Sequence, residues 1–289
     1  MTDPINFINE QYLNSNFDFS IDYMQKEKAI AYIETDCSSG SGFMFTSNGL
    51  CFTCAHVVKN SSSIYVRLKT NETIVSIYKA NVLFQNDSLD FAILLLENCD
   101  NNYFFVLETE FSNIKSGDDI AVFGFPFGTD LNKDIRTLEP SLTKGYIASK
   151  NKINEQICYY LDVRSAPGNS GGPIFSKNQK VFGYLCGSYG TDRSNLVYMR
   201  TLESFLIMLK DNYRANRKHT KLTPEIALKY ETIIANKLMP REEKILKMLL
   251  GLSGDDPMSP LEISRIYNVC VNRVYQVEAK FLRILRHQK

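Results

Sequence analysis

Pro-Gly-Asn-Ser-Gly-Gly-Pro, residues 167–173, places one serine among three glycines and between two prolines. Glycine allows backbone conformations that other residues disfavour, so this segment predicts a tight turn. Such a turn can direct neighbouring backbone N–H groups toward one point. A serine hydroxyl is a poor nucleophile until an adjacent base removes its proton. The segment therefore predicts a reactive serine, provided that the fold brings a base to it.

Two earlier segments supply the partners that this serine needs. His56 follows an apolar run, and Asp90 opens another one. An imidazole base requires a carboxylate that fixes its tautomer and stabilises its protonated form. We predict a catalytic triad of His56 as base, Asp90 as its orienting carboxylate and Ser170 as nucleophile, with an oxyanion hole at Gly168, Asn169 and Ser170. The alternative is a structural histidine and a plain glycine turn.

The surrounding chain reads as short apolar runs from about residue 30 to residue 199, separated by turn residues such as Asn48-Gly49. Many short strands at regular spacing indicate an all-β barrel or sandwich. The three segments and Gly40-Ser41-Gly42-Phe43 resemble the trypsin/chymotrypsin superfamily, and within it the HtrA-type (Deg-like) peptidases. The resemblance implies two β-barrels with the triad between them, and a protein or peptide substrate cleaved through an acyl-enzyme.

The resemblance also implies a substrate pocket beside the nucleophile. Residues just before the serine and on the following strand line that pocket in the superfamily, which here gives Arg164, Ser165, Ala166, Gly183, Tyr184 and Leu185. An Arg164 guanidinium that points into the pocket favours an acidic substrate residue. An Arg164 that points to solvent carries no such preference.

The spacing of apolar residues becomes helical after Tyr198. Pro240 begins one apolar-patterned segment and Gly251 ends it, a short segment follows at 259–267, and Asn268 separates it from a longer one. A short helix, a tight turn and a basic second helix form the helix-turn-helix plan. Residues 238–242, 261–263 and 273–283 resemble region 4 of sigma-70-family sigma factors. The resemblance implies contacts with double-stranded DNA or RNA polymerase, with DNA-binding residues Asn272, Arg273, Gln276, Lys280 and Arg283. The alternative is a helical bundle that packs on the peptidase.

Charge separates the two parts of the chain. Residues 210–289 hold 16 Lys and Arg against 9 Asp and Glu, a net charge of +7, whereas residues 1–209 carry −6. A basic tail on an acidic body suggests that only the tail meets a polyanion, although a solvated basic face is the alternative. The first 20 residues lack the basic and apolar regions of a secretory signal, and seven scattered cysteines suggest free thiols. We therefore expect a cytoplasmic location and no membrane partner.

Together these observations predict a multidomain β plus α protein, a chymotrypsin-like double β-barrel followed by a small all-helical helix-turn-helix domain. We expect an N-terminal arm at 1–25, a trypsin-like serine peptidase domain at 26–210, a helical linker at 211–237 and the helix-turn-helix domain at 238–289. The expected function is a bacterial serine endopeptidase coupled to a DNA- or polymerase-binding module in transcription regulation or stress and defence signalling, with no cofactor and no metal. The alternative is a sigma-like transcription regulator whose peptidase fold only senses or scaffolds.

Overall fold

The computed structural model describes residues 4–5, 7–8, 26–70, 74–99, 101, 103–128, 139–153, 156–175, 179–189, 196–209, 231, 233–235, 237–252, 257–269, 273–274, 276–278 and 280–281. The chain divides into two compact units. One comprises Asn14–Ser204, and the other comprises Met1–Leu13 with Phe205–Lys289. Within the described residues, no helix has the length and apolar character needed to cross a membrane.

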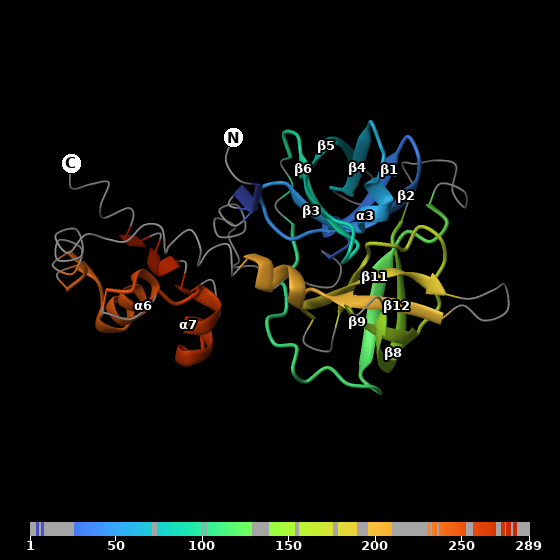
Figure 1. Cartoon of the computed structure of the whole chain (residues 1–289). Coiled ribbons are helices and arrows are strands. Elements are labelled where there is room, and N and C mark those ends of the chain that lie inside the picture. Colours follow the sequence, from blue (N-terminus) through green and yellow to red (C-terminus); the bar gives the residue numbers. More distant parts are fainter. Residues whose placement is uncertain are drawn as a thin grey trace. The chain divides into compact units, whose positions relative to one another are not determined.

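The first barrel closes six antiparallel strands in the order β1-β2-β3-β6-β5-β4 (Figure 1). Its strands are β1 (Ile30–Thr35), β2 (Ser39–Met44), β3 (Leu50–Thr53), β4 (Ile64–Lys69), β5 (Val75–Asn86) and β6 (Phe91–Leu96), preceded by the short 3-10 helix η1 (Glu27–Ala29). Aromatic rings fill its interior, since Phe52 stacks on Phe43 and on Phe91 with centroids 5.2 Å and 5.4 Å apart. The alternation of buried and more exposed residues along β4 shows one face of the strand turned to this core.

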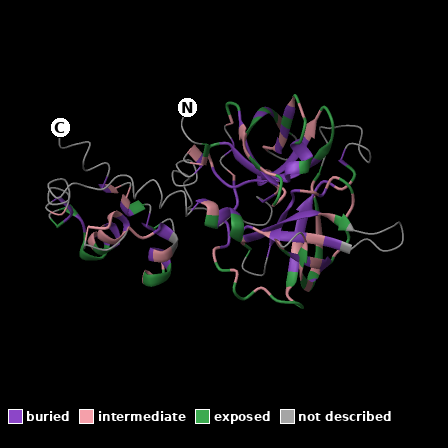
Figure 2. Cartoon of the chain, viewed as in Figure 1, coloured by how far each residue is buried: buried purple, intermediate pink, exposed green. Residues whose placement is uncertain are grey.

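The second barrel closes six further strands in the order β10-β11-β12-β9-β8-β7. They are β7 (Asp119–Gly124), β8 (Ser141–Ile153), β9 (Gln156–Asp162), β10 (Pro173–Phe175), β11 (Val181–Tyr189) and β12 (Leu196–Thr201). Aliphatic side chains such as Val122, Ile174 and Met199 form its core, and Figure 2 shows buried residues inside both barrels. The predicted double β-barrel is confirmed.

Tyr184 of β11 fastens the two barrels together. Its ring lies 4.9 Å from the ring of Phe52, and its hydroxyl donates a hydrogen bond of 2.6 Å to the carbonyl oxygen of Leu89. The side chain is 2% exposed. Because one end of Tyr184 is bonded and the other is packed, the second barrel fixes the turn that leads into β6 of the first.

The C-terminal unit contains α6 (Pro240–Leu250) and α7 (Pro260–Tyr267), each with proline in its first turn. Ser259 caps α7 by accepting a hydrogen bond from the N–H of Glu262, and Asn268 ends this helix in the left-handed conformation. Both helices pack on a shared core that includes Ile245, Leu246, Ile263 and, from the following segment, Val274, Val277 and Phe281. The helix-turn-helix assignment stays a prediction, as do the domain boundaries. Residues 211–230 of the predicted linker lie outside the described residues.

Candidate active site

His56 lies on α3 (Ala55–Val58), a single helical turn that directly follows β3. Its neighbours Ala55, Val57 and Val58 are buried, and Val57 packs so closely on Gly40 that a Cβ there would lie 2.6 Å from Val57 Cγ2. The apolar neighbours anchor the turn in the first barrel. The imidazole is left on the outside, with its side chain 49% exposed.

Asp90 reaches His56 from the turn before β6. The residue adopts a φ of 54°, a left-handed conformation that Asp tolerates better than most side chains. Asn86 supports this turn, since its Oδ1 accepts a 2.9 Å hydrogen bond from the N–H of Leu89. The carboxylate oxygens of Asp90 lie 3.0 Å and 2.9 Å from His56 Nδ1, and one also accepts the backbone N–H of His56 at 3.0 Å. Two contacts from one carboxylate hold the ring and its backbone together.

The loop that carries Ser170 belongs to the second barrel, but β2 of the first barrel positions it. Ser41 donates its backbone N–H to the carbonyl oxygen of Ser170 at 2.8 Å and its hydroxyl to that of Gly168 at 2.6 Å. Gly168 and Gly171 have φ values of 96° and 86°, in the region that favours glycine. A Cβ at Gly171 would also clash with the carbonyl oxygen of Ser41. The glycines that the sequence singled out are therefore required both by conformation and by close approach.

This anchoring leaves two backbone donors free near the serine. Within the described part of the chain, the N–H groups of Gly168 and Ser170 donate no hydrogen bond. Asn169 differs from the prediction, because its N–H donates to the carbonyl oxygen of Ala166 at 3.1 Å. Its side chain is buried against Gly124, where a Cβ would lie 2.7 Å from Asn169 Oδ1. Asn169 therefore shapes the turn, and Gly168 and Ser170 are the two donors that can meet an anion.

The serine hydroxyl does not point at the imidazole. Ser170 Oγ donates to the carbonyl oxygen of Cys186 at 3.3 Å, and among the described residues no hydrogen bond joins it to His56. Cys186 nevertheless lies close to both Ser170 and Asp90, because its sulfur lies within 4.8 Å of an Asp90 carboxylate oxygen. Catalytic hydrogen bonds are often long or misaligned in proteins without substrate. Catalysis by this pair requires the Ser170 hydroxyl to leave the carbonyl oxygen of Cys186 and to meet the imidazole.

Sequence reasoning missed the supporting roles of three residues, although it had named Ser41 in a motif and Tyr184 as a pocket residue. Ser41, Tyr184 and Cys186 bond to the nucleophile loop, the Asp90 turn and the serine hydroxyl respectively. Beside them, burial raises the pKa of the Cys54 thiol well above its usual value, and the neighbouring Cys186 raises it further. The small residues of Gly40-Ser41-Gly42 were the one sign of this support in the sequence, because a strand segment without large side chains lets another backbone segment approach closely.

The predicted substrate-pocket residues fall into two groups. Arg164 is exposed, and Ser165 and Ala166 are partly exposed on the approach to the nucleophile loop. The β11 residues are buried instead. Leu185 packs in the core of the second barrel, Tyr184 packs between the barrels, and a Cβ at Gly183 would lie 2.5 Å from Met199 Cε. The side chains of Tyr184 and Leu185 therefore support the site from behind and do not line an open pocket.

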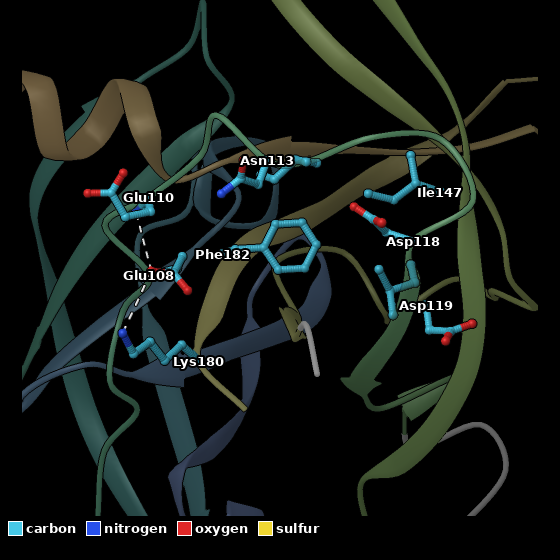
Figure 3. Close-up of a pocket in the computed structure, with 10 residues that line it drawn as sticks. Glu108, Glu110, Asn113, Asp118, Asp119, Ile147, Lys180 and Phe182 are labelled. Atoms are coloured by element: carbon cyan, nitrogen blue, oxygen red, sulfur yellow. Dashed lines mark hydrogen bonds and ion pairs between the residues drawn. The ribbon is translucent and has the colours of Figure 1, made fainter. Parts of the chain in front are cut away.

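A hollow of about 390 Å³ lies on the second barrel and involves none of the predicted site residues. Its polar lining includes Glu108, Glu110, Asp118, Asp119 and Lys180. Figure 3 shows the ring of Phe182 between Glu108 and Lys180 on one side and Asp118 and Asp119 on the other. Glu108 is partnered, because Oε1 accepts the N–H groups of Thr109 and Glu110 and lies 3.7 Å from Lys180 Nζ. The hollow is separate from the triad.

The predicted DNA-contacting residues surround a buried carboxylate. Glu242 of α6 is 8% exposed and pairs with Lys280 at 2.6 Å and with Arg273 at 3.4 Å. Arg273 also donates to Gln276 Oε1 at 3.1 Å. These three side chains are thus engaged within their own unit. Asn272 and Arg283 lie outside the described residues.

Comparison with known proteins places the barrels in a family. The model of the trypsin-like peptidase domain matches residues 40–183. Probable periplasmic serine endoproteases of DegP-like type match with 31% identity in Pseudomonas putida (strain W619) and 32% in Halomonas elongata, each over 150 residues and 50% of this chain. The chain covers only 28% of either relative.

Solved structures agree on the fold. The HtrA-type protease AlgW with a tripeptide superposes with a TM-score of 0.53 at 20% identity, covering 65% of this chain and 62% of that one. The MamO protease domain from Magnetospirillum magneticum gives a TM-score of 0.53 at 14% identity, covering 65% of this chain and 98% of that one.

The prediction of a cytoplasmic location is wrong by these comparisons, because the curated relatives are named periplasmic. The N-terminal pattern and the free thiols were insufficient grounds for it. Residues 40–183 of this chain form a trypsin-like peptidase domain, which is similar to that of DegP-like serine endoproteases.

Proposed function

We propose that the double barrel is a serine endopeptidase that cleaves protein or peptide substrates. His56 takes the proton of Ser170 as the serine attacks a peptide carbonyl, and Asp90 holds the imidazole in the required tautomer. The observation that carries the proposal is the carboxylate of Asp90, which contacts both Nδ1 and the backbone N–H of His56 at about 3 Å. A merely structural histidine has no need of both contacts.

The free N–H groups of Gly168 and Ser170 support the next step. The substrate carbonyl oxygen becomes negatively charged in the tetrahedral intermediate, and two preorganised backbone donors stabilise this charge. The intermediate collapses to an acyl-enzyme on Ser170 as His56 returns its proton to the leaving amine. Water, activated by the same imidazole, then releases the acyl group.

A fluorophosphonate probe tests the proposal, because it labels only an activated serine. We expect wild-type chain to be labelled, Ser170→Ala to be unlabelled and His56→Ala to be strongly slowed. Ser39→Ala changes an exposed serine of β2 and should label as wild type does. A folded wild-type chain that resists the probe and cleaves no casein would favour the non-catalytic, scaffolding function instead.

The exposed position of Arg164 bears on the substrate residue that precedes the cleaved bond. An exposed Arg164 matches the alternative in which its guanidinium stays outside the pocket, so we expect no strong preference for an acidic side chain there. Cleavage of a peptide series with Asp, Leu or Arg at this position measures the preference. Equal rates for all three would leave Arg164 without a role in specificity.

For the C-terminal unit we propose a helix-turn-helix that binds double-stranded DNA or RNA polymerase and so localises proteolysis. The core shared by α6, α7 and residues 274–281 and the left-handed Asn268 support the fold. The net charge of +7 over residues 210–289 supports a polyanionic partner. The family model matches residues 40–183 and so ends before this unit, whose role rests on these observations alone.

A test of DNA binding has to account for Glu242, because Arg273 and Lys280 also form ion pairs with this carboxylate. Alanine at either position should weaken a salt-dependent DNA shift, whereas exposed Lys244→Ala should not. Glu242→Gln separates contact from folding, since it keeps both cations and removes the internal acceptor charge. Binding that survives in Glu242→Gln and weakens in the two alanine variants supports DNA contact. Equal loss in all three would mean that the unit had merely unfolded.

A further inference from the structure

Two buried thiols lie directly behind Asp90. Cys54 occupies the junction between β3 and α3, and Cys186 lies on β11 where the pairing with β12 shifts register. The two sulfur atoms and an Asp90 carboxylate oxygen all lie within 4.8 Å of one another. Cys54 and Cys186 are 0% and 2% exposed, whereas the Asp90 side chain is 20% exposed. The cluster is therefore closed on the sulfur side and reaches solvent at the carboxylate.

The backbone on both sides of this cluster is fixed. The thiol of Cys54 donates to the carbonyl oxygen of Leu185 at 3.2 Å, which directs its sulfur toward β11. The same carbonyl oxygen accepts the N–H of Gly171 at 2.7 Å, so the nucleophile loop braces it. The third donor, Asp90, is held by His56. Three donors from three elements thus converge on one point without any rearrangement of the strands.

Two sulfurs and one carboxylate oxygen are a donor set that suits a thiophilic divalent cation such as Zn²⁺, with the fourth tetrahedral position left for solvent. Bond lengths of about 2.0–2.3 Å put the ligand atoms of such a centre roughly 3.3–3.8 Å apart. The present separations, all within 4.8 Å, must shorten to that range on binding. We propose that Cys54, Cys186 and Asp90 bind a thiophilic divalent cation, each thiol releasing its proton to solvent as it coordinates.

The consequence for catalysis rests on the proposed peptidase function. An Asp90 oxygen that coordinates the cation becomes a weaker acceptor for His56 Nδ1, and the hydrogen bond then depends on the other carboxylate oxygen. The two thiolates balance the charge of the cation, so the effect on the imidazole comes through the carboxylate. A carboxylate that shares its negative charge with the cation stabilises the protonated ring of acylation less. The bound cation therefore weakens the triad, and its release restores it.

Cadmium binding tests the site independently of activity, because a Cd²⁺–thiolate bond has an ultraviolet charge-transfer band. The full chain is used with Cys37→Ser and Cys270→Ser, which remove an exposed thiol and one outside the described residues. We expect the band to saturate at one equivalent and to be lost in Cys54→Ser and in Cys186→Ser. Cys51→Ser is the control. It changes a buried thiol of β3 that is not part of the cluster, and we expect the band to remain. Absence of the band, or its survival in both ligand variants, would overturn the proposal.

Two further measurements separate the possible failures. If a serine variant does not fold, alkylation of the parent chain with and without Cd²⁺ still decides, because coordination protects Cys54 and Cys186 together and leaves Cys51 unchanged. Fluorophosphonate labelling of Ser170 should fall by about 100-fold or more with Zn²⁺, toward the loss expected when a triad carboxylate is removed. Unchanged labelling beside a clear cadmium band refutes the weakening of the triad. Absent labelling without metal refutes the peptidase function and leaves the site standing.

Discussion

Ser41 donates its hydroxyl hydrogen to the carbonyl oxygen of Gly168 at 2.6 Å, although the two residues belong to different barrels. The same Ser41 oxygen accepts the N–H of Phe125 at 2.9 Å. The carbonyl of Gly168 is thereby held by the first barrel, in the peptide unit that lies between the N–H groups of Gly168 and Ser170. A peptide unit that is fixed in this way costs no reorganisation when an anion forms.

Ser41→Ala should lower kcat by about 10- to 100-fold and change KM little. Removing a whole oxyanion donor costs about 100- to 1000-fold, and this variant only loosens the peptide unit that lies between the two donors. It also leaves the N–H of Phe125 without its acceptor, so the free energy of unfolding should fall by about 1–3 kcal/mol. Peptide-cleavage kinetics and thermal unfolding measure both effects.

Ser39→Ala is the matched control, because Ser39 is exposed on the same strand. Its kinetics and stability should equal those of wild type. Full activity of Ser41→Ala would show that the bond to Gly168 has no part in the oxyanion hole.

Asp90→Asn should lower kcat by about 10,000-fold, because the amide no longer fixes the tautomer or stabilises the protonated ring. Asp87 lies in the same turn but is exposed and pairs with Lys59 at 2.9 Å. Asp87→Asn should therefore retain activity. Comparison of kcat for the two variants at constant pH measures the difference, and similar losses in both would refute the role assigned to Asp90.

The proposed triad could be derived from the sequence because each member sits in a short motif whose chemistry is local. His56 follows one apolar run, Asp90 opens another, and the glycines around Ser170 predict a tight turn. The double barrel followed from the spacing of short apolar runs together with the family resemblance. Hydrophobic periodicity and glycine placement can be recognised in the sequence because each depends on only a few neighbouring residues.

The supporting contacts were not accessible, because they join residues far apart in the chain. Ser41 and Gly168 are 127 positions apart, and Tyr184 and Leu89 are 95 apart. Nothing in β11 as a sequence distinguishes Tyr184 and Leu185, which are buried, from residues of an open pocket. The amide of Asn169 was assigned to the oxyanion hole because turn direction cannot be derived from residue types alone.

Gly171→Ala should destabilise the peptidase domain far more than Gly117→Ala. Both glycines have positive φ, 86° and 90°, so alanine costs about 1–2 kcal/mol at either for backbone conformation. At Gly117 no atom lies within 4 Å of the added Cβ, whereas at Gly171 it meets the carbonyl oxygen of Ser41. The excess loss of stability in thermal unfolding therefore reports the contact between barrels. Equal melting temperatures would show that the nucleophile loop can move away from β2 without penalty.

Acid should destabilise the C-terminal unit through Glu242. The hydrogen bond from Lys280 lowers the pKa of this carboxyl, the N–H of Met239 and the charge of Arg273 lower it too, and partial burial opposes them. Because the folded pKa lies below the unfolded one, the stabilisation is complete above about pH 5 and is lost as the pH falls through the folded pKa. Glu242→Gln should remove this slope and lower stability at neutral pH by about 1–3 kcal/mol, the range for hydrogen bonds to charged groups. Glu243→Gln, which breaks only a surface pair with Lys247 at 2.7 Å, should keep the wild-type slope. Thermal unfolding followed by helical circular dichroism across this pH range distinguishes the variants, and an unchanged acid slope in Glu242→Gln would assign the titration to another carboxylate.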